Sequence, residues 1–170
     1  MAAHKGIPVG TVDIDLVVYA QSRFKLAELL NELASLGVPV DPALALRELD
    51  EKKLTALPMP VATPEGQATF VVELILPKIP VLDAAVLSRA IAVPYPGRAE
   101  GIPVVTLPDW MVFKLIFFRE KDRRAVDDVL RTTPDLDVGY VAICLGMVFP
   151  PEDERLRWFA NALARYGFET

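Results

Sequence analysis

Two aspartates one residue apart, Asp13 and Asp15, stand in the apolar run 11–19 and are the residues of this chain best suited to chemistry. Alternate side chains of a β-strand share a face, so the two carboxylates would lie about 6 to 7 Å apart along the strand. One divalent cation can bridge that gap, and magnesium prefers hard oxygen ligands of this kind. The alternative is a half-exposed strand with two solvated acids. Because Asp-x-Asp is a short pattern, it needs support from elsewhere in the chain.

A third acid, Glu73, interrupts a second strand-like run at 69–76. Its neighbours are Val, Leu and Ile, which is typical of a strand buried on both faces. A carboxylate in such a strand is costly unless it is paired with a cation or binds a metal. Glu73 therefore either forms an ion pair with a basic residue such as Lys114 or Arg119, or is a third metal ligand that faces the two aspartates.

Lys114 is the only charged residue in the apolar segment 110–118, which the sequence predicts to be helical. It either extends along the helix to reach water or directs its ammonium group at the phosphates of a nucleotide. The next segment, 119–124, is rich in charge, which is typical of a solvated helix junction with weak local ion pairs.

The chain offers little material for other catalytic sites. It has one histidine, His4, and one cysteine, Cys144, which disfavours a Ser-His-Asp or Cys-His site and a zinc site of ordinary composition. No glycine-rich phosphate-binding pattern occurs. The formal net charge is -5, so contact with nucleic acid would require a local basic patch.

The distribution of apolar residues bears on compartment and size. The longest apolar stretches are well short of the roughly 20 residues that span a bilayer, and the first residues lack the apolar segment of a secretory signal. A single cysteine cannot form an internal disulfide. We therefore expect a cytoplasmic protein without a membrane helix, and a single domain over residues 1–170.

The elements that must position these side chains follow from periodicity, capping residues and turn formers. Helices are predicted at 22–36, 42–54, 83–89, 108–120, 121–131, 137–146 and 151–166, strands at 11–19, 69–76, 91–95 and 102–106, and a loop at 58–67. The predicted fold class is α/β (α+β), with a small mixed sheet flanked by helices and a helical C-terminal third. Residues 136–170 form a helical extension whose last helix either closes the core or docks a second subunit of a homodimer.

Several short motifs occur in an order that is informative. They are His4-Lys-Gly-Ile-Pro8, Thr11-Val-Asp13-Ile-Asp15, Glu73, Pro108-Asp-Trp-Met-Val-Phe-Lys114, Arg119-Glu-Lys121-Asp122 and Asp127. In type and order they resemble the nucleotidyltransferase superfamily, and within it the small bacterial proteins related to the toxins of abortive-infection and other toxin–antitoxin pairs. The resemblance covers residues 2–145.

The resemblance implies a minimal nucleotidyltransferase fold, with Asp13 and Asp15 on one strand of a mixed sheet and Glu73 on its neighbour. It also implies that these acids hold Mg²⁺ and that Glu73 helps to activate the attacking hydroxyl. Lys114 and Lys121 resemble phosphate-side or packing residues, and Arg119 is expected to bind the nucleotide with them. The implied reaction is transfer of a nucleoside monophosphate from an NTP to a hydroxyl of RNA, protein or a small molecule. An antitoxin is the implied partner.

One family feature has no counterpart before Asp13. Relatives carry a Gly-Gly or Gly-Ser pair at the start of a helix that precedes the aspartates, and residues 1–12 contain neither pair. The N-terminus of such a helix supplies backbone donors to the triphosphate. The alternative function is therefore a catalytically degenerate protein of this fold that acts as a binding or oligomerisation module.

Overall fold

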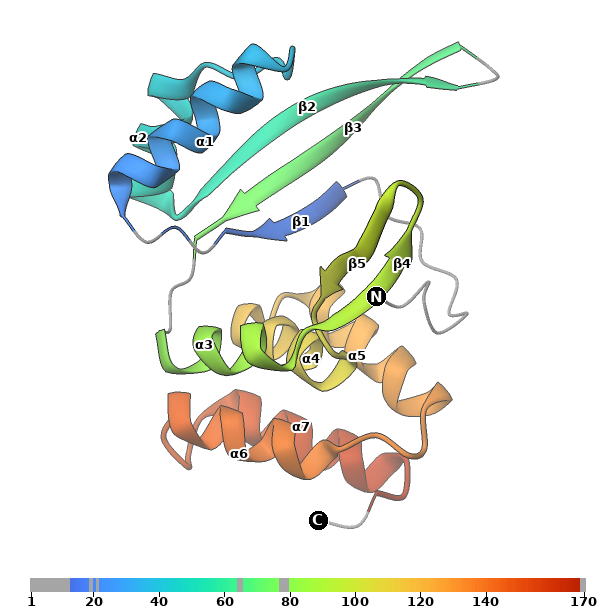
Figure 1. The fold of residues 1–170 in the computed structure, drawn as a ribbon. Helices are drawn as coiled ribbons and strands as arrows, with labels where there is room; N and C mark the ends of the chain where they lie inside the picture. Colours follow the sequence, from blue (N-terminus) through green and yellow to red (C-terminus); the bar gives the residue numbers. More distant parts are fainter. Residues whose placement is uncertain (1–12, 19, 21, 64–65, 77–79, 169–170) are drawn as a thin grey trace. The chain divides into compact units, whose positions relative to one another are not determined.

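The computed structural model describes residues 13–18, 20, 22–63, 66–76 and 80–168, and it divides the chain into two compact units (Figure 1). We call residues 10–83 the N-terminal unit and residues 84–170 the C-terminal unit. Small sheets flanked by helices, with a helical C-terminal region, confirm the predicted mixed α/β class. His4 and the motif around it lie outside the described residues.

The N-terminal unit is a three-stranded sheet with two helices on one face (Figure 1). Its elements are β1 (Asp13–Val17), α1 (Arg23–Ser35), α2 (Pro42–Lys52), β2 (Leu54–Thr63) and β3 (Gly66–Ile75). The strand order is β1-β3-β2, with β1 parallel and β2 antiparallel to β3. Leucines of both helices pack against Leu57 and Leu74 of the sheet to form the core.

Both helices begin at the residues that the sequence predicts. The Ser22 hydroxyl accepts the Lys25 N–H at 3.2 Å at the start of α1. A carboxylate oxygen of Asp41 accepts two backbone N–H groups at the start of α2, where Pro42 occupies the first helical position. These caps satisfy donors that a helix N-terminus leaves without partners. Gly37, at φ +84°, follows α1 in the left-handed region that glycine adopts without strain.

Strand β2 shows that the predicted loop at 58–67 is wrong, because residues 54–63 form one strand and β3 begins at Gly66. Pro58 and Pro60 are residues of a type that commonly forms turns. Both prolines pair with odd-numbered residues of β3. The carbonyl oxygen of Ile75, which is also odd-numbered, accepts the N–H of Val18 beside β1, so the odd-numbered residues of β3 direct their backbone groups toward β1 and not toward β2. The two prolines therefore occupy positions of an edge strand where no ladder bond to β3 is needed.

The C-terminal unit combines a β-hairpin with a group of helices (Figure 1). Its elements are α3 (Pro80–Arg89), whose larger part belongs to this unit, β4 (Ile91–Tyr95), β5 (Arg98–Val104), α4 (Leu107–Phe117), α5 (Glu120–Thr132), α6 (Val138–Val148) and α7 (Glu154–Arg165). The predicted elements all occur, with α3 and β5 starting earlier than expected. α7 starts later, at the Asp153 cap.

The last helix contributes to the core of the C-terminal unit. Phe159 and Leu163 of α7 are buried, as are Met111 and Leu115 of α4. The buried side of α7 therefore closes a core, which is one of the two alternatives that the sequence leaves open for the last helix. No helix among the described residues has the length and apolar character needed to cross a membrane.

Candidate functional site

The parallel pairing of β1 and β3 brings the three predicted acids to neighbouring positions. Asp15 is the register partner of Glu73, and Asp13 is the partner of Val71. Register partners project to the same side of a sheet, as do residues two apart on one strand. Asp13, Asp15 and Glu73 therefore share one face of two strands that run about 4.8 Å apart.

The face that carries the acids is turned away from α1 and α2. The even-numbered residues Val72 and Leu74 of β3 pack into the core beneath the helices, so the odd-numbered Glu73 occupies the opposite face. Asp15 is exposed and Glu73 is half-buried, with half-buried Val71 and Ile75 beside it on the same face. The acids thus lie on a partly apolar surface of the sheet.

The chemistry of this set suits a hard divalent cation, because three carboxylates supply only oxygen donors. No group of three or more His, Cys, Asp and Glu side chains that could hold a metal ion occurs among the residues that the structure describes. The side chain of Asp13 lies outside those residues, so only Asp15 and Glu73 of the trio enter that comparison. The backbone register alone places Asp13 on the acidic face.

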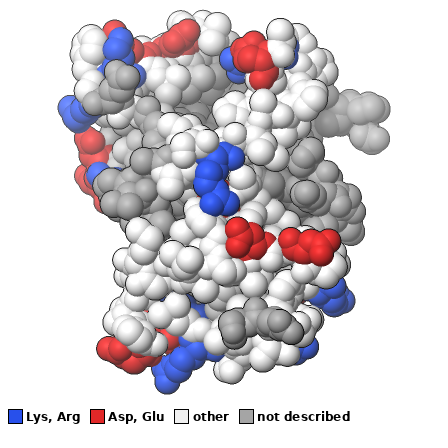
Figure 2. Space-filling view, turned by 60° about the horizontal axis from the view of Figure 1, so that its bottom comes forward, with Lys and Arg blue, Asp and Glu red and all other residues white. Residues whose placement is uncertain are grey.

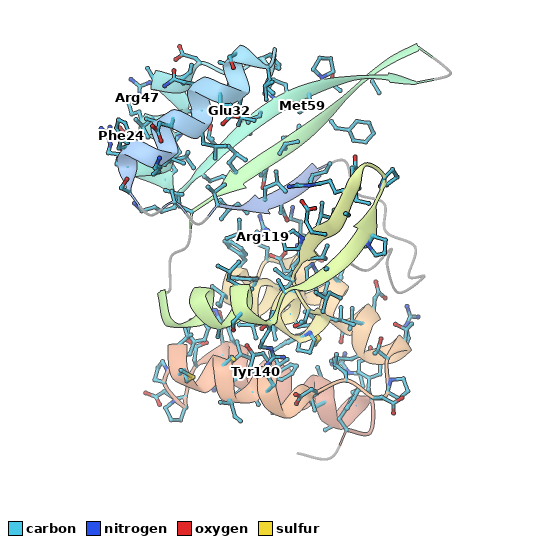
Figure 3. All side chains as sticks on the ribbon, in the orientation of Figure 1. Phe24, Glu32, Arg47, Met59, Arg119 and Tyr140 are labelled. Atoms are coloured by element: carbon cyan, nitrogen blue, oxygen red, sulfur yellow. The ribbon has the colours of Figure 1, made fainter. Side chains whose placement is uncertain are left out.

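The predicted phosphate-side residues belong to the C-terminal unit, at the junction of α4 and α5. Lys114 lies in the last turn of α4, and its Nζ is 3.6 Å from Oδ1 of Asp122. Arg119, labelled in Figure 3, directly precedes α5, and its Nε donates to Oδ2 of Asp122 at 2.6 Å. Lys121 is exposed on α5. Lys114 therefore does not simply extend into water, since its side chain is 22% exposed and ion-paired.

Asp122 is the buried centre of this junction. Its side chain is 1% exposed. Burial raises the pKa of the Asp122 carboxyl, but the hydrogen bonds and positive charge of Arg119, with the charge of Lys114, outweigh burial and hold that pKa below its ordinary value. Asp122 is therefore ionised at neutral pH and carries a full negative charge inside the protein.

A second buried carboxylate, Asp109 of α4, was not anticipated as a special residue. It is 0% exposed, accepts a hydrogen bond from the Tyr140 hydroxyl at 2.6 Å and another from the Thr106 hydroxyl. Nε of Arg89 lies 3.5 Å from its Oδ2. The guanidinium of Arg89 also stacks 3.6 Å from the centroid of the Tyr140 ring. This cluster joins α3, α4 and α6, with Tyr140 lying among them (Figure 3).

Part of this cluster has a sequence signal. Thr106 and Asp109 are three residues apart at the start of α4, which is the spacing of a capping box, and the Thr106 hydroxyl accepts the Asp109 N–H. The partner Tyr140 is 31 residues further along the chain, so no local pattern connects it to Asp109. Burial raises the pKa of Tyr140, and its hydrogen bonds to Asp109 and Cys144 raise it further.

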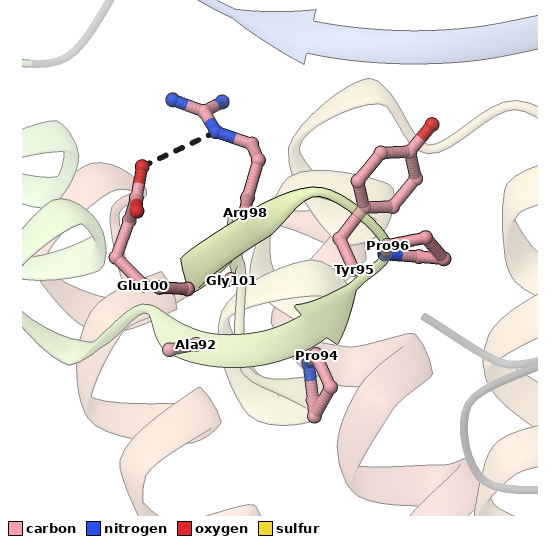
Figure 4. Close-up of a pocket in the computed structure, with 8 residues that line it drawn as sticks. Ala92, Pro94, Tyr95, Pro96, Arg98, Glu100 and Gly101 are labelled. Atoms are coloured by element: carbon pink, nitrogen blue, oxygen red, sulfur yellow. Dashed lines mark hydrogen bonds and ion pairs between the residues drawn. The ribbon is translucent and has the colours of Figure 1, made fainter.

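A hollow of about 580 Å³ lies against the β4–β5 hairpin, and all its lining residues belong to that hairpin (Figure 4). Its charged residues, Arg98 and Glu100, are paired with each other at 3.3 Å. On the face drawn in Figure 2, charged side chains form small separate groups without a continuous basic area.

Comparisons with protein-family models, with curated proteins and with solved structures give no match to this chain.

Proposed function

We propose that this protein is a Mg²⁺-dependent nucleotidyltransferase that transfers a nucleoside monophosphate from an NTP to a hydroxyl of RNA, protein or a small molecule. The observation that carries this proposal is the β1–β3 register, which pairs Asp15 with Glu73 and puts Asp13 two residues away on the same face. Three acids from sequence-distant strands on one face are the arrangement expected of a phosphoryl-transfer metal site.

In this proposal Asp13, Asp15 and Glu73 would hold the metal, which supplies charge neutralisation to the phosphates when bound. Glu73 is half-buried, with the apolar residues Val71 and Ile75 on the same face of its strand. Lys114, Arg119 and Lys121 would bind phosphate groups. We place the activity in the cytoplasm, with an antitoxin as the partner that the motif order suggests.

The proposal is tested first by metal binding, read by the electron paramagnetic resonance of Mn²⁺ used in place of Mg²⁺. We expect Asp15→Asn and Glu73→Gln each to weaken Mn²⁺ binding by about tenfold or more, because each removes a charged oxygen ligand. Glu51→Gln is the matched control, since Glu51 is an exposed acid on α2 of the same unit. Equal Mn²⁺ binding by the wild type and the three variants would contradict the proposed metal site and the proposed enzymatic activity.

Transfer itself is then measured with each of the four α-³²P-labelled ribonucleoside triphosphates and a mixture of RNA and protein acceptors. Label transfer that Asp15→Asn abolishes supports the transferase. Metal and nucleotide binding without any transfer would instead favour the binding-module alternative, in which the acids retain a ligand without catalysis.

A further inference from the structure

We infer that Arg123 of α5 anchors a binding site for a carboxylate group that is carried next to an apolar group. Arg123 is half-buried, and its guanidinium carbon lies 5.0 Å from the centroid of the Phe118 ring. Among the residues that the structure describes, this guanidinium has no hydrogen bond and no ion pair. A partly buried cation without a counterion is unfavourable, and a ligand that supplies a negative charge relieves it.

A second arginine shares the Phe118 ring and shows which group these surroundings hold. The guanidinium carbon of Arg155 lies 5.7 Å from the centroid of Phe118 and 4.4 Å from that of Phe149. Its Nη1 donates to both carboxylate oxygens of Asp153, at 3.1 and 3.0 Å. One of the two guanidinium groups around this ring therefore already binds a carboxylate, whereas the other has none within the described part of the chain.

The cluster also holds more hydrogen-bond donors than the described residues supply acceptors for. Nε of Arg155 is buried and has no partner among them, and the N–H donors of the Arg123 guanidinium are not engaged by them either. The rings around these donors are apolar, with the centroid of Trp158 lying 5.8 Å from that of Phe118 in an edge-to-face contact. What the cluster lacks is a negatively charged acceptor, and the partly exposed Arg123 is the donor that a ligand reaches.

The chemistry of the cluster selects a carboxylate over a phosphate. A guanidinium fork matches the oxygens of either group, so shape alone does not distinguish them. Charge does, because a phosphate brings up to two negative charges to a chain of net charge -5, whereas a carboxylate brings one. The half-buried rings of Phe118, Phe149 and Trp158 add apolar surface, which favours a hydrocarbon group beside the carboxylate.

The ligand class is therefore an acid with an adjacent apolar group, either an acidic residue of another protein or a small carboxylic acid. None of the residues involved is a proposed metal ligand or a proposed phosphate-binding residue. The inference thus goes beyond the proposed nucleotidyltransferase and does not depend on it.

The test is a titration of the ¹⁵N-labelled full-length protein, followed by the NMR signals of arginine Nε–H groups. One probe is phenylpropanoate, and the other is the capped tripeptide Ac-Leu-Glu-Leu-amide. We expect a saturable shift of the Arg123 signal, and the probe with the lower Kd identifies the source of the carboxylate. Inorganic phosphate and the uncharged Ac-Leu-Gln-Leu-amide bind more weakly than that probe.

Variants of Arg123 separate the guanidinium from its charge. Arg123→Gln weakens binding of the tighter probe by about tenfold or more, because it removes charge-assisted hydrogen bonds. Arg123→Lys keeps the charge but loses the planar fork, so its affinity lies between the two. The matched control is Arg124→Gln, which alters the next residue of the same helix, an exposed arginine that pairs with Glu120. It leaves binding unchanged.

The inference is overturned if neither carboxylate shifts the Arg123 signal saturably, if phosphate binds as tightly as the better carboxylate, or if Arg123→Gln binds like the wild type. Circular dichroism checks that Arg123→Gln is folded. If it is not, the wild-type Arg123 signal, identified by its absence in Arg123→Lys, decides the outcome. The titration contains neither metal nor nucleotide, so failure of the Mn²⁺ or the transfer experiment leaves this result standing.

Discussion

At the scale of single residues, two buried aspartates of the C-terminal unit differ in the partners that surround them. Asp109 faces one cation, Arg89, and two hydroxyl donors, so its charge is balanced and its oxygens are satisfied within the fold. Asp122 lies within ion-pair distance of two cations, Lys114 and Arg119. Both arrangements give a buried carboxylate partners within the fold.

The Asp109 cluster gives a prediction at this scale. Tyr140→Phe deletes the hydroxyl that donates to Asp109 at 2.6 Å and leaves a buried carboxylate oxygen with one donor fewer. We expect the free energy of unfolding at pH 7 to fall by about 1 to 3 kcal/mol. Chemical denaturation followed by circular dichroism measures it. A change below about 0.5 kcal/mol would mean that the hydroxyl contributes no net stability.

The same variant has a pH signature. The pKa of Tyr140 in the folded protein lies above the ordinary value of 10.0 because of burial and its bonds to Asp109 and Cys144. Above pH 10 the unfolded chain therefore releases this proton first, and the folded protein loses stability as pH rises. The decline above pH 10 should be shallower in Tyr140→Phe than in the wild type. Equal slopes would contradict the raised pKa.

At the scale of elements, the β4–β5 hairpin depends on one close backbone approach. Gly101 has φ +70°, and a Cβ added there would lie 2.6 Å from the carbonyl oxygen of Val93. The register shifts between Val93 and Tyr95 on the opposite strand, as at a β-bulge, where glycine commonly permits the local twist. Gly97 in the turn also has positive φ, but nothing lies within 4 Å of its added Cβ.

The two glycines form a matched pair for an experiment. Gly97→Ala adds only backbone strain of about 1 kcal/mol, whereas Gly101→Ala adds the same strain and a clash with backbone. We expect thermal unfolding to rank the wild type as most stable, then Gly97→Ala, then Gly101→Ala. The reverse order of the two variants would show that the hairpin rearranges freely around Val93.

The sequence predicted the helices well because their ends carry local chemistry. Ser22 and Asp41 accept backbone N–H groups where the pattern of capping residues predicts helix starts. β2 was missed because Pro58 and Pro60 act as breakers in most contexts. Whether proline fits a strand depends on which edge of the sheet that strand occupies, and this is a tertiary property.

The candidate site was also predictable in part, where local patterns alone determine the positions of its residues. Alternation along a strand put Asp13 and Asp15 on one face from sequence alone, whereas the pairing of Asp15 with Glu73 depends on strand register. The contact of Tyr140 with Asp109 joins helices that no local pattern relates. The burial of Asp122 was not predictable, because a charged segment after an apolar helix is usually solvated, whereas the side chain of Asp122 is 1% exposed.

At the scale of the whole molecule, each compact unit has a core of its own. The N-terminal unit buries leucines of α1 and α2 against its sheet, and the C-terminal unit buries apolar residues of α4 to α7. The proposed metal ligands and the proposed phosphate-binding residues belong to different units.

Separate cores predict separate folding. A fragment of residues 80–170 should show helical circular dichroism and unfold cooperatively by itself, because it contains every element of the C-terminal unit from α3 to α7. Circular dichroism with urea titration measures this. A fragment that stays unfolded would show that residues 1–170 behave as the single domain expected from length.

The strand order of the N-terminal unit also determines the order in which its strands can pair during folding. β2 and β3 are consecutive and pair as a hairpin, whereas β1 must pair with β3 across two helices and a strand. Local contacts form early in folding and non-local ones late, because closing a long loop costs more entropy. The acids of β1 therefore reach Glu73 only when the sheet is completed. A cation held by both strands would stabilise that completed sheet alone, which couples ligand binding to the final step of folding.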